Sequence, residues 1–301
     1  MGLDFSGIFP ALTTPFGADG AVALADLKHN VSLYNKTGLA GYLAIGSTGE
    51  SVLLEETERE AVLAAVKEAA APGKILIAGT GAESTAATIR WTRRAAELGY
   101  QAALVKTPYY FKPMYKAEVL AAHFRRVADA SPIPVLLYSV PQFTGVALEA
   151  GEVEALAAHP NIVGLKESSG NVQRVGEIIA AAPAAFQVLV GSASTLNVSL
   201  VTGARGGILA LACVLPELCV ELYRLARGGS AEGARRLQEA LLPASRVIVG
   251  ANGPAGVKCA MESRGYRGGP PRLPLQPLGE AARQEIGKIL AALPAVEAAR
   301  A

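Results

Sequence analysis

Short apolar segments rich in Val, Ile and Leu recur along the chain, separated by longer segments rich in alanine and charged residues. Apolar runs bounded by Gly, Pro and polar residues are typical of buried strands. We predict strands at 8–13, 41–45, 75–79, 102–106, 135–139, 162–166, 187–191 and 206–210. Eight strands that alternate with helices within about 250 residues favour an α/β fold, the (β/α)8 TIM barrel. An open doubly wound sheet fits less well, because no G-x-G-x-x-G motif follows the first strand.

Helices are predicted between the strands and after the last of them. Ser84 is a typical N-cap and Gly99 a typical terminator, so we expect a helix over 84–98. Further examples of expected helices are 26–37, 54–71, 116–130, 147–158, 216–227, 231–249, 254–263 and 280–293. Segment 264–277 is too rich in Gly and Pro to be helical. We predict a barrel over 1–215 and a C-terminal helical appendage over 216–301 that packs on the barrel.

The composition indicates a protein that works in solution inside a cell. The net charge is +2 and no basic tract occurs, so nucleic acid and membranes are poor partners. The N-terminal sequence lacks a signal-peptide pattern, and no apolar stretch is long enough for a membrane span. Cys213, Cys219 and Cys259 form no C-x-x-C pair, which is typical of reduced thiols. We expect a cytoplasmic location.

Lys166 is the most informative residue for function. It ends a predicted strand, and barrel enzymes carry their chemistry at the carboxyl ends of the strands. Burial disfavours an ammonium and leaves the neutral amine that attacks a ketone. On position alone, a lysine that reaches solvent or pairs with Glu167 is the commoner explanation. The residues at the ends of the neighbouring strands are therefore needed to choose between the two explanations.

Tyr138 ends the strand before that of Lys166, so the two side chains are expected to share the barrel mouth. A phenol beside an attacking amine can carry protons. Lys106 also ends a predicted strand and is a competing nucleophile. We favour Lys166 because a tyrosine ends the adjacent strand and a Ser-Ser-Gly turn follows.

Other kinds of catalytic site fit the sequence less well. All three histidines fall on predicted helices or helix ends, so we expect neither a metal site nor Ser-His-Asp catalysis. The turn GSTGES at 46–51 lacks the Lys-Ser/Thr of a P-loop, and a simple glycine turn explains it as well as anion binding does. Hydroxyls and glycine backbone at the strand ends suit a small carboxylated carbonyl compound, with no cofactor.

Four motifs carry a resemblance to a known family. They are GSTGES (46–51), TPYYFKP (107–113), LLYSVP (136–141) and GLKESSG (164–170). In order and spacing, and over essentially the whole chain, they resemble the dihydrodipicolinate synthase / N-acetylneuraminate lyase family. Members of that family are (β/α)8 class I enzymes, which form a Schiff base between a lysine of the sixth strand and pyruvate or another 2-oxo acid.

The resemblance implies a role for each matching residue. Lys166 would be the Schiff-base lysine, and Tyr138 the proton donor and acceptor beside it. Ser47 and Thr48 would bind the pyruvate carboxylate and help to relay protons. Tyr110 would complete the relay from a neighbouring subunit, so we expect a homo-oligomer, either a dimer or a tetramer. The remaining substrate-binding candidates are Ser168, Gly191 and the backbone carbonyl of Ile208.

The sequence departs from the synthase pattern at Phe143. In the synthases the residue two after the proline of the tyrosine motif is an arginine that holds the carboxylate of aspartate semialdehyde. Segments 131–141, 159–170, 186–193 and 265–278 look most like the 4-hydroxy-2-oxoglutarate aldolase branch. The resemblance to that branch implies a different reaction from that of the synthases.

We therefore expect a class I aldolase that cleaves a hydroxy-2-oxo acid, best 4-hydroxy-2-oxoglutarate, to pyruvate and an aldehyde. The first alternative is a dihydrodipicolinate synthase, which condenses pyruvate with aspartate semialdehyde. The second is a 2-oxo acid sensor without turnover. Lys166, Tyr138 and Tyr110 together argue against a sensor, because binding alone needs no proton relay.

Overall fold

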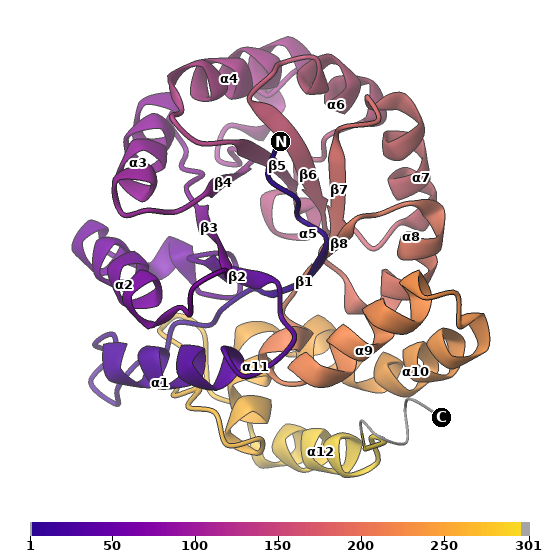
Figure 1. The fold of residues 1–301 in the computed structure, drawn as a ribbon. Coiled ribbons are helices and arrows are strands. Elements are labelled where there is room, and N and C mark those ends of the chain that lie inside the picture. The colour runs from indigo at the N-terminus through magenta and orange to yellow at the C-terminus, as the bar shows by residue number, and fades with distance from the viewer. Residues whose placement is uncertain (1, 296–301) are drawn as a thin grey trace.

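The computed structural model describes residues 2–295, in which eight parallel strands form one sheet in the order β1-β8-β7-β6-β5-β4-β3-β2. The strands are β1 Gly7–Pro10, β2 Gly41–Ala44, β3 Ile75–Gly79, β4 Ala102–Lys106, β5 Val135–Ser139, β6 Ile162–Glu167, β7 Gln187–Val190 and β8 Gly206–Leu209. Every strand overlaps the segment predicted for it. Figure 1 shows the helices arranged in a ring around the strands, which confirms the predicted TIM barrel.

The barrel closes between its first two strands. Ladder pairing joins β1 to β8 over Gly7–Pro10, whereas β1 and β2 are linked more sparsely. The Ala40 N–H donates to the Ile8 carbonyl and the Leu12 N–H donates to the Leu43 carbonyl, each at 2.9 Å. These bonds leave no open sheet edge, so all eight carboxyl ends meet at one mouth.

Helices follow the strands as expected. They are α1 Leu24–Tyr34, α2 Glu56–Ala69, α3 Thr85–Glu97, α4 Ala117–Ala130, α5 Pro141–Thr144, α6 Ala150–Ala157, α7 Val172–Ala181, α8 Leu196–Thr202, α9 Pro216–Arg227, α10 Ala231–Ala244, α11 Gly253–Glu262 and α12 Glu280–Ala291. Short 3₁₀ segments lie at η1 Ser51–Leu53, η2 Lys112–Met114, η3 Ala193–Thr195 and η4 Leu211–Cys213. The Ser84 hydroxyl caps α3 by accepting from the Ala87 N–H at 3.1 Å, and Gly99 follows the helix at a φ of +83°, as predicted.

Side chains fill the inside of the barrel and close its N-terminal end. Phe5, Phe9, Leu104, Leu136 and Leu189 are fully or almost fully buried in this inner cluster. The N-terminal segment crosses the middle of the barrel in Figure 1. The inside of the barrel is thus a packed core rather than a pore, and the open space lies at its C-terminal mouth.

The C-terminal helices pack on one side of the barrel, beside α1 (Figure 1), and α9 contacts both β1 and α8. Segment 264–277 contains no helix, as predicted. The helix expected over 231–249 differs from the structure, because α10 ends at Ala244 and a π-helical segment, η5 Ser245–Ala251, continues it. Pro243 has no N–H for an α-helical bond, which weakens the α-helix where the wider turns begin. The division of the chain at residue 215 stays a prediction.

None of the helices within residues 2–295 is long and apolar enough to cross a membrane. The three cysteines, all in α9, α11 or the segment η4, are free thiols.

His123 should make the fold sensitive to acid. It is buried on α4, where its Nδ1 lies 2.9 Å from the Thr85 hydroxyl. Burial, and then the nearby charge of Lys106, lower its pKa to about 4 from an ordinary value of 6.5. The unfolded chain therefore takes up the proton first as pH falls, and the free energy of unfolding should decrease through this interval by up to roughly 3 kcal/mol.

Urea unfolding of the wild type and of His123→Asn, at a series of pH values, measures this effect. The stability difference between the two proteins should shrink as pH falls from 6.5 to 4. A difference that stays constant across that range would contradict the assignment.

Candidate active site

Lys166 and Tyr138 meet at the barrel mouth. They are register partners on β6 and β5, so both side chains point into the barrel from neighbouring strands. Lys166 Nζ lies 4.4 Å from the centre of the Tyr138 ring. Both residues are buried, with Lys166 4% and Tyr138 5% exposed. The expectation that the two side chains share the mouth is confirmed.

A cleft of about 570 Å³ opens above Lys166. Seven of the eight candidate site residues predicted from the sequence line it, namely Ser47, Thr48, Tyr138, Lys166, Ser168, Gly191 and Ile208. They come from β2, β5, β6, β7 and β8 or from the loops that follow these strands. The structure therefore brings these candidates together, while the role of each one remains a proposal.

Lys106, the competing lysine, is engaged elsewhere. It is the register partner of Tyr138 on β4, but its Nζ lies 3.6 Å from a Glu83 oxygen and 4.5 Å from the centre of the Tyr109 ring. Burial lowers the pKa of Lys106, and the Glu83 carboxylate opposes this shift. Lys106 is not among the residues that line the cleft above Lys166. The geometry therefore favours Lys166 as the nucleophile.

The turn after β2 carries the hydroxyls of Ser47 and Thr48. The Ser47 hydroxyl lies 3.4 Å from the Tyr138 hydroxyl, so a proton can pass between them after a small movement. Gly49 is closely packed, since a Cβ there would lie 2.8 Å from the Leu12 carbonyl oxygen. The glycine is therefore required by the backbone, and the two hydroxyls are fixed by the turn.

A buried ion pair holds the other end of this turn. Glu50 adopts a left-handed φ of +54°, and its carboxylate lies 2.5 Å from Lys258 Nζ of α11. The Arg272 N–H donates to the same carboxylate at 2.8 Å. Burial lowers the pKa of Lys258, and Glu50 opposes this shift. Sequence reasoning missed this pair, because its members are far apart in the chain.

Gly191 permits a close approach of β7 to Lys166. A Cβ at this position would collide with the Ser168 hydroxyl and lie 3.1 Å from Lys166 Cε. The Ser168 hydroxyl is buried and has no hydrogen-bond partner within residues 2–295. This wall of the cleft thus combines a free hydroxyl with space that only glycine leaves open.

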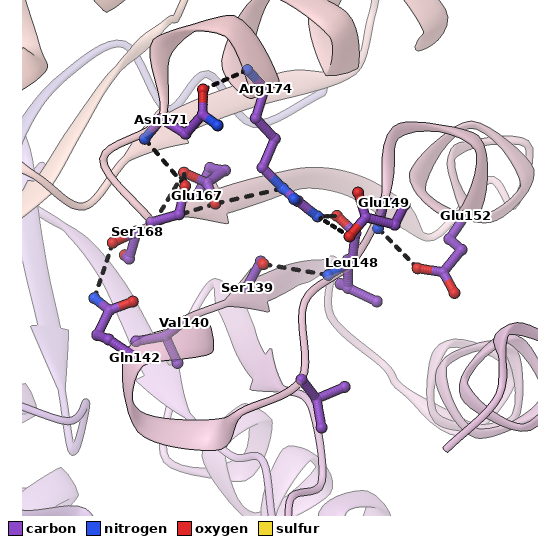
Figure 2. A network of polar contacts seen from close by, with 12 residues as sticks. Ser139, Val140, Gln142, Leu148, Glu149, Glu152, Glu167, Ser168, Asn171 and Arg174 are labelled. Atoms are coloured by element: carbon purple, nitrogen blue, oxygen red, sulfur yellow. Dashed lines mark hydrogen bonds and ion pairs between the residues drawn. The ribbon is translucent and has the colours of Figure 1, made fainter. Parts of the chain in front are cut away.

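Polar contacts outside the barrel hold the loop after β6, as Figure 2 shows. Glu167 points away from Lys166 and accepts hydrogen bonds from the Ser169 N–H and hydroxyl, while Arg174 Nε lies 3.8 Å from it. Gln142 donates to the Ser168 carbonyl at 2.9 Å. Burial raises the pKa of Glu167, and the bonds from Ser169 oppose this shift. Glu167 is therefore occupied in fixing the loop, and it does not pair with Lys166.

The upper part of the cleft contains residues that sequence reasoning missed. Ser194, Ser245 and Arg246 line it, together with Ser192, which directly follows the candidate Gly191, and Phe143, which was singled out and is 63% exposed. Ser194 and Ser245 join the loop after β7 to η5, with 2.9 Å between their hydroxyl oxygens. Serines in short helical segments and an arginine in the C-terminal helical region carry no pattern that would have marked them.

Tyr110 does not line the cleft of its own chain. It is 74% exposed, and its ring packs edge-on against Phe111 at 4.9 Å. Its N–H donates to Glu83. A contribution of the Tyr110 hydroxyl to a relay would therefore have to come from another copy of the chain.

The histidines lie away from the mouth, as expected. His29 and His123 are on α1 and α4, and His159 follows α6. Among residues 2–295 no group of three or more His, Cys, Asp or Glu side chains is arranged to hold a metal ion.

Comparison with known proteins identifies relatives over nearly the whole chain. Residues 4–293 match the dihydrodipicolinate synthetase family. The 4-hydroxy-tetrahydrodipicolinate synthase of an Exiguobacterium species is 38% identical over 94% of this chain and 96% of its own. The synthase of Methanoculleus marisnigri is 39% identical over 95% of this chain and 98% of its own.

Comparison with solved structures identifies relatives of the same kind. A dihydrodipicolinate synthase from Bacillus anthracis superposes with a TM-score of 0.93 at 30% identity, covering 97% of this chain and 100% of that one. The synthase from Acinetobacter baumannii, solved in complex with pyruvate, gives 0.90 at 32% identity, covering 95% and 98%.

These relatives are all named synthases, so the comparisons favour the synthase over the aldolase branch that the sequence patterns indicated. The expectation of an enzyme rather than a sensor is confirmed. The chain belongs to the dihydrodipicolinate synthetase family and is a class I, Schiff-base-forming, pyruvate-dependent lyase with a TIM-barrel fold.

Proposed function

We propose that this enzyme condenses pyruvate with aspartate semialdehyde, as a 4-hydroxy-tetrahydrodipicolinate synthase does. The observation that carries the proposal is the buried amine of Lys166, 4.4 Å from the Tyr138 ring at the floor of a cleft lined by hydroxyls. The named relatives, 36–39% identical to this chain in the closer cases, support the choice of reaction.

The site residues suggest a sequence of steps. Lys166 Nζ attacks the C2 carbonyl of pyruvate, and loss of water leaves an imine. Removal of a C3 proton gives an enamine, whose C3 attacks the aldehyde carbon and forms the new carbon–carbon bond, while the aldehyde oxygen takes up a proton. The amine of aspartate semialdehyde then displaces Lys166 Nζ from C2, which closes the ring and frees the enzyme. Tyr138 carries the protons together with Ser47, and each such transfer contributes ~10²–10⁴-fold. Ser47 and Thr48 hold the pyruvate carboxylate through hydroxyl and backbone groups.

A second candidate is the retro-aldol cleavage of 4-hydroxy-2-oxoglutarate. Phe143 favours it, because this side chain lines the cleft where the synthase pattern has an arginine. In this reaction the imine on Lys166 draws electrons from the C3–C4 bond, Tyr138 takes the proton of the C4 hydroxyl, and an enamine of pyruvate remains. The chemistry at Lys166 is the same in both candidates.

One preparation tested in both reactions distinguishes them. We expect kcat/KM for the condensation to exceed kcat/KM for the cleavage. Phe143→Arg serves as the companion variant, because it restores the residue of the synthase pattern. A larger value for the cleavage in the unmodified enzyme would select the second candidate and leave the Schiff-base chemistry intact.

We also propose a cytoplasmic location and a homo-oligomer whose subunits complete one another's sites. Free thiols support the location. The exposed cluster of Tyr110, Phe111 and Met114, each at least 63% exposed, supports an interface, because apolar clusters of this kind commonly mark contacts between proteins.

If Tyr110 serves the partner's site, Tyr110→Phe should lower kcat by ~10²-fold or more without changing the oligomer, because it removes only a hydroxyl from the relay. Sedimentation measures the oligomer, and steady-state kinetics measures kcat. Tyr109→Phe is the matched control and should retain most activity. A fully active monomer at the assay concentration would rule the idea out.

A further inference from the structure

The π-helical segment η5 forms one side of the upper cleft. Ser245, Arg246, Val249 and Gly250 of this segment line the cleft. Their spacing of four to five residues matches the wide turn of a π-helix, so they share one face. Irregular helical turns of this kind occur often at functional sites. The segment thus contributes an arginine to the lining of the cleft above Lys166.

Arg246 is free to bind a ligand. Its side chain is exposed, and within residues 2–295 its guanidinium forms no ion pair and no hydrogen bond. Arg174, which does not line the cleft, is by contrast held by Glu149 at 3.0 Å. An arginine that lines an enzyme's cleft without a protein partner can offer its full set of donors to an anion.

The surroundings of Arg246 suit a carboxylate. Of the described residues that line the cleft, Lys166 and Arg246 are the cationic ones and none is acidic. The hydroxyls of Ser192, Ser194 and Ser245 line the same cleft. One hydrogen is used in the bond between Ser194 and Ser245, so the Ser192 hydroxyl and one hydroxyl of that pair can donate to a ligand. Phe143, which also lines the cleft, contributes no charge.

Lys166 and Arg246 lie at different depths in the cleft. Lys166 is 4% exposed on its strand, so it lies at the floor, whereas Arg246 is exposed and lies at the rim. A molecule that reacts at Lys166 and extends through the open part of the cleft therefore occupies the same cleft that Arg246 lines. A monocarboxylic 2-oxo acid needs only the floor of the cleft, but a longer acid with a second carboxylate can use both cations.

We infer that Arg246, together with the serines beside it, binds the distal carboxylate of the second substrate and so selects carboxylated partners. The inference rests on the proposed function, because it takes the reacting carbonyl to be at Lys166. It holds for condensation with aspartate semialdehyde and for cleavage of 4-hydroxy-2-oxoglutarate alike, since both substrates carry a distal carboxylate. According to this inference, the guanidinium that binds the distal carboxylate comes from η5, whereas the synthase pattern places it at position 143.

The test compares two 2-oxo acids of equal length, 2-oxoglutarate and 2-oxopentanoate, of which only the first has a distal carboxylate. Borohydride reduction traps the imine of each acid, and the concentration that half-saturates trapping at Lys166 is measured. Arg246→Gln should raise this concentration about 10- to 100-fold for 2-oxoglutarate, the usual effect of losing a hydrogen bond to a charged group. The values for 2-oxopentanoate and pyruvate should not change.

Arg236→Gln is the matched control, because Arg236 is exposed on α10 and does not line the cleft. It should alter none of the three values. An equal effect of Arg246→Gln on both five-carbon acids, or no effect, would overturn the role of Arg246 while leaving the Schiff base intact. Failure of the unmodified enzyme to trap pyruvate at Lys166 would overturn the proposed function as well.

Discussion

Replacing Lys166 by methionine should abolish turnover and imine formation together. Methionine has a similar length and suits a buried site, but it offers no nucleophile. Removal of a covalent catalyst leaves only the binding and proton-transfer groups, so kcat/KM should fall on the order of 10³-fold or more. Borohydride reduction in the presence of pyruvate should add one pyruvate-derived mass to each wild-type chain, on the peptide that contains Lys166, and none to the variant.

Lys106→Met is the control for this experiment. Lys106 is also at a strand end beside Tyr138 and only slightly exposed, yet it is held by Glu83 and lies outside the cleft above Lys166. The Lys106 variant should still be labelled at Lys166. Label on Lys106 in the wild type, or labelling that survives in Lys166→Met, would refute the assignment of the nucleophile.

The strands and the Lys166–Tyr138 pair could be predicted because both depend on local patterns. Apolar runs bounded by turn residues identified each strand to within a few residues. Once eight strands alternate with helices, the barrel topology brings all their carboxyl ends to one mouth. Residues 138 and 166 end neighbouring strands, so their contact follows from the topology without any knowledge of side-chain packing.

The contribution of the C-terminal segment could not be predicted in this way. Helical periodicity indicated α10 and α11, but it does not say on which part of the barrel a helix packs. Arg246 reaches the cleft because the helix changes to a π-helical turn after Pro243. Lys258 was an ordinary lysine in the sequence, and only the packing of α11 places it against Glu50.

The choice between two members of one family depends on few residues. Phe143 suggested an aldolase, whereas the named relatives are synthases. The residue at position 143 alone does not determine the reaction, because the cation that binds a substrate carboxylate can also come from another wall of the same cleft. Arg246 is such a cation, and sequence motifs do not reveal it because it lies in η5, outside the motifs of the barrel strands.

The ion pair between Glu50 and Lys258 should be essential for stability. Both side chains are almost fully buried, and Lys258 Nζ also donates to the Pro270 carbonyl at 3.0 Å and lies 4.3 Å from the centre of the Phe16 ring. Lys258→Met leaves the Glu50 carboxylate buried without its cation. Removing one partner of a buried pair typically costs ~3–5 kcal/mol, which corresponds to a decrease in Tm of roughly 5–15 °C.

The double variant Glu50→Gln with Lys258→Met separates the loss of the pair from the loss of packing. Without an unpaired charge it should recover a large part of the stability, because the uncompensated carboxylate accounts for most of the cost. Lys28→Met, which breaks an exposed pair with Glu68, should change the free energy of unfolding by at most ~1 kcal/mol. Since Glu50 ends the turn that carries Ser47 and Thr48, the folded fraction of Lys258→Met should also need more pyruvate to saturate imine trapping. Equal stability of Lys258→Met and Lys28→Met would show that the buried pair does not hold this turn in place.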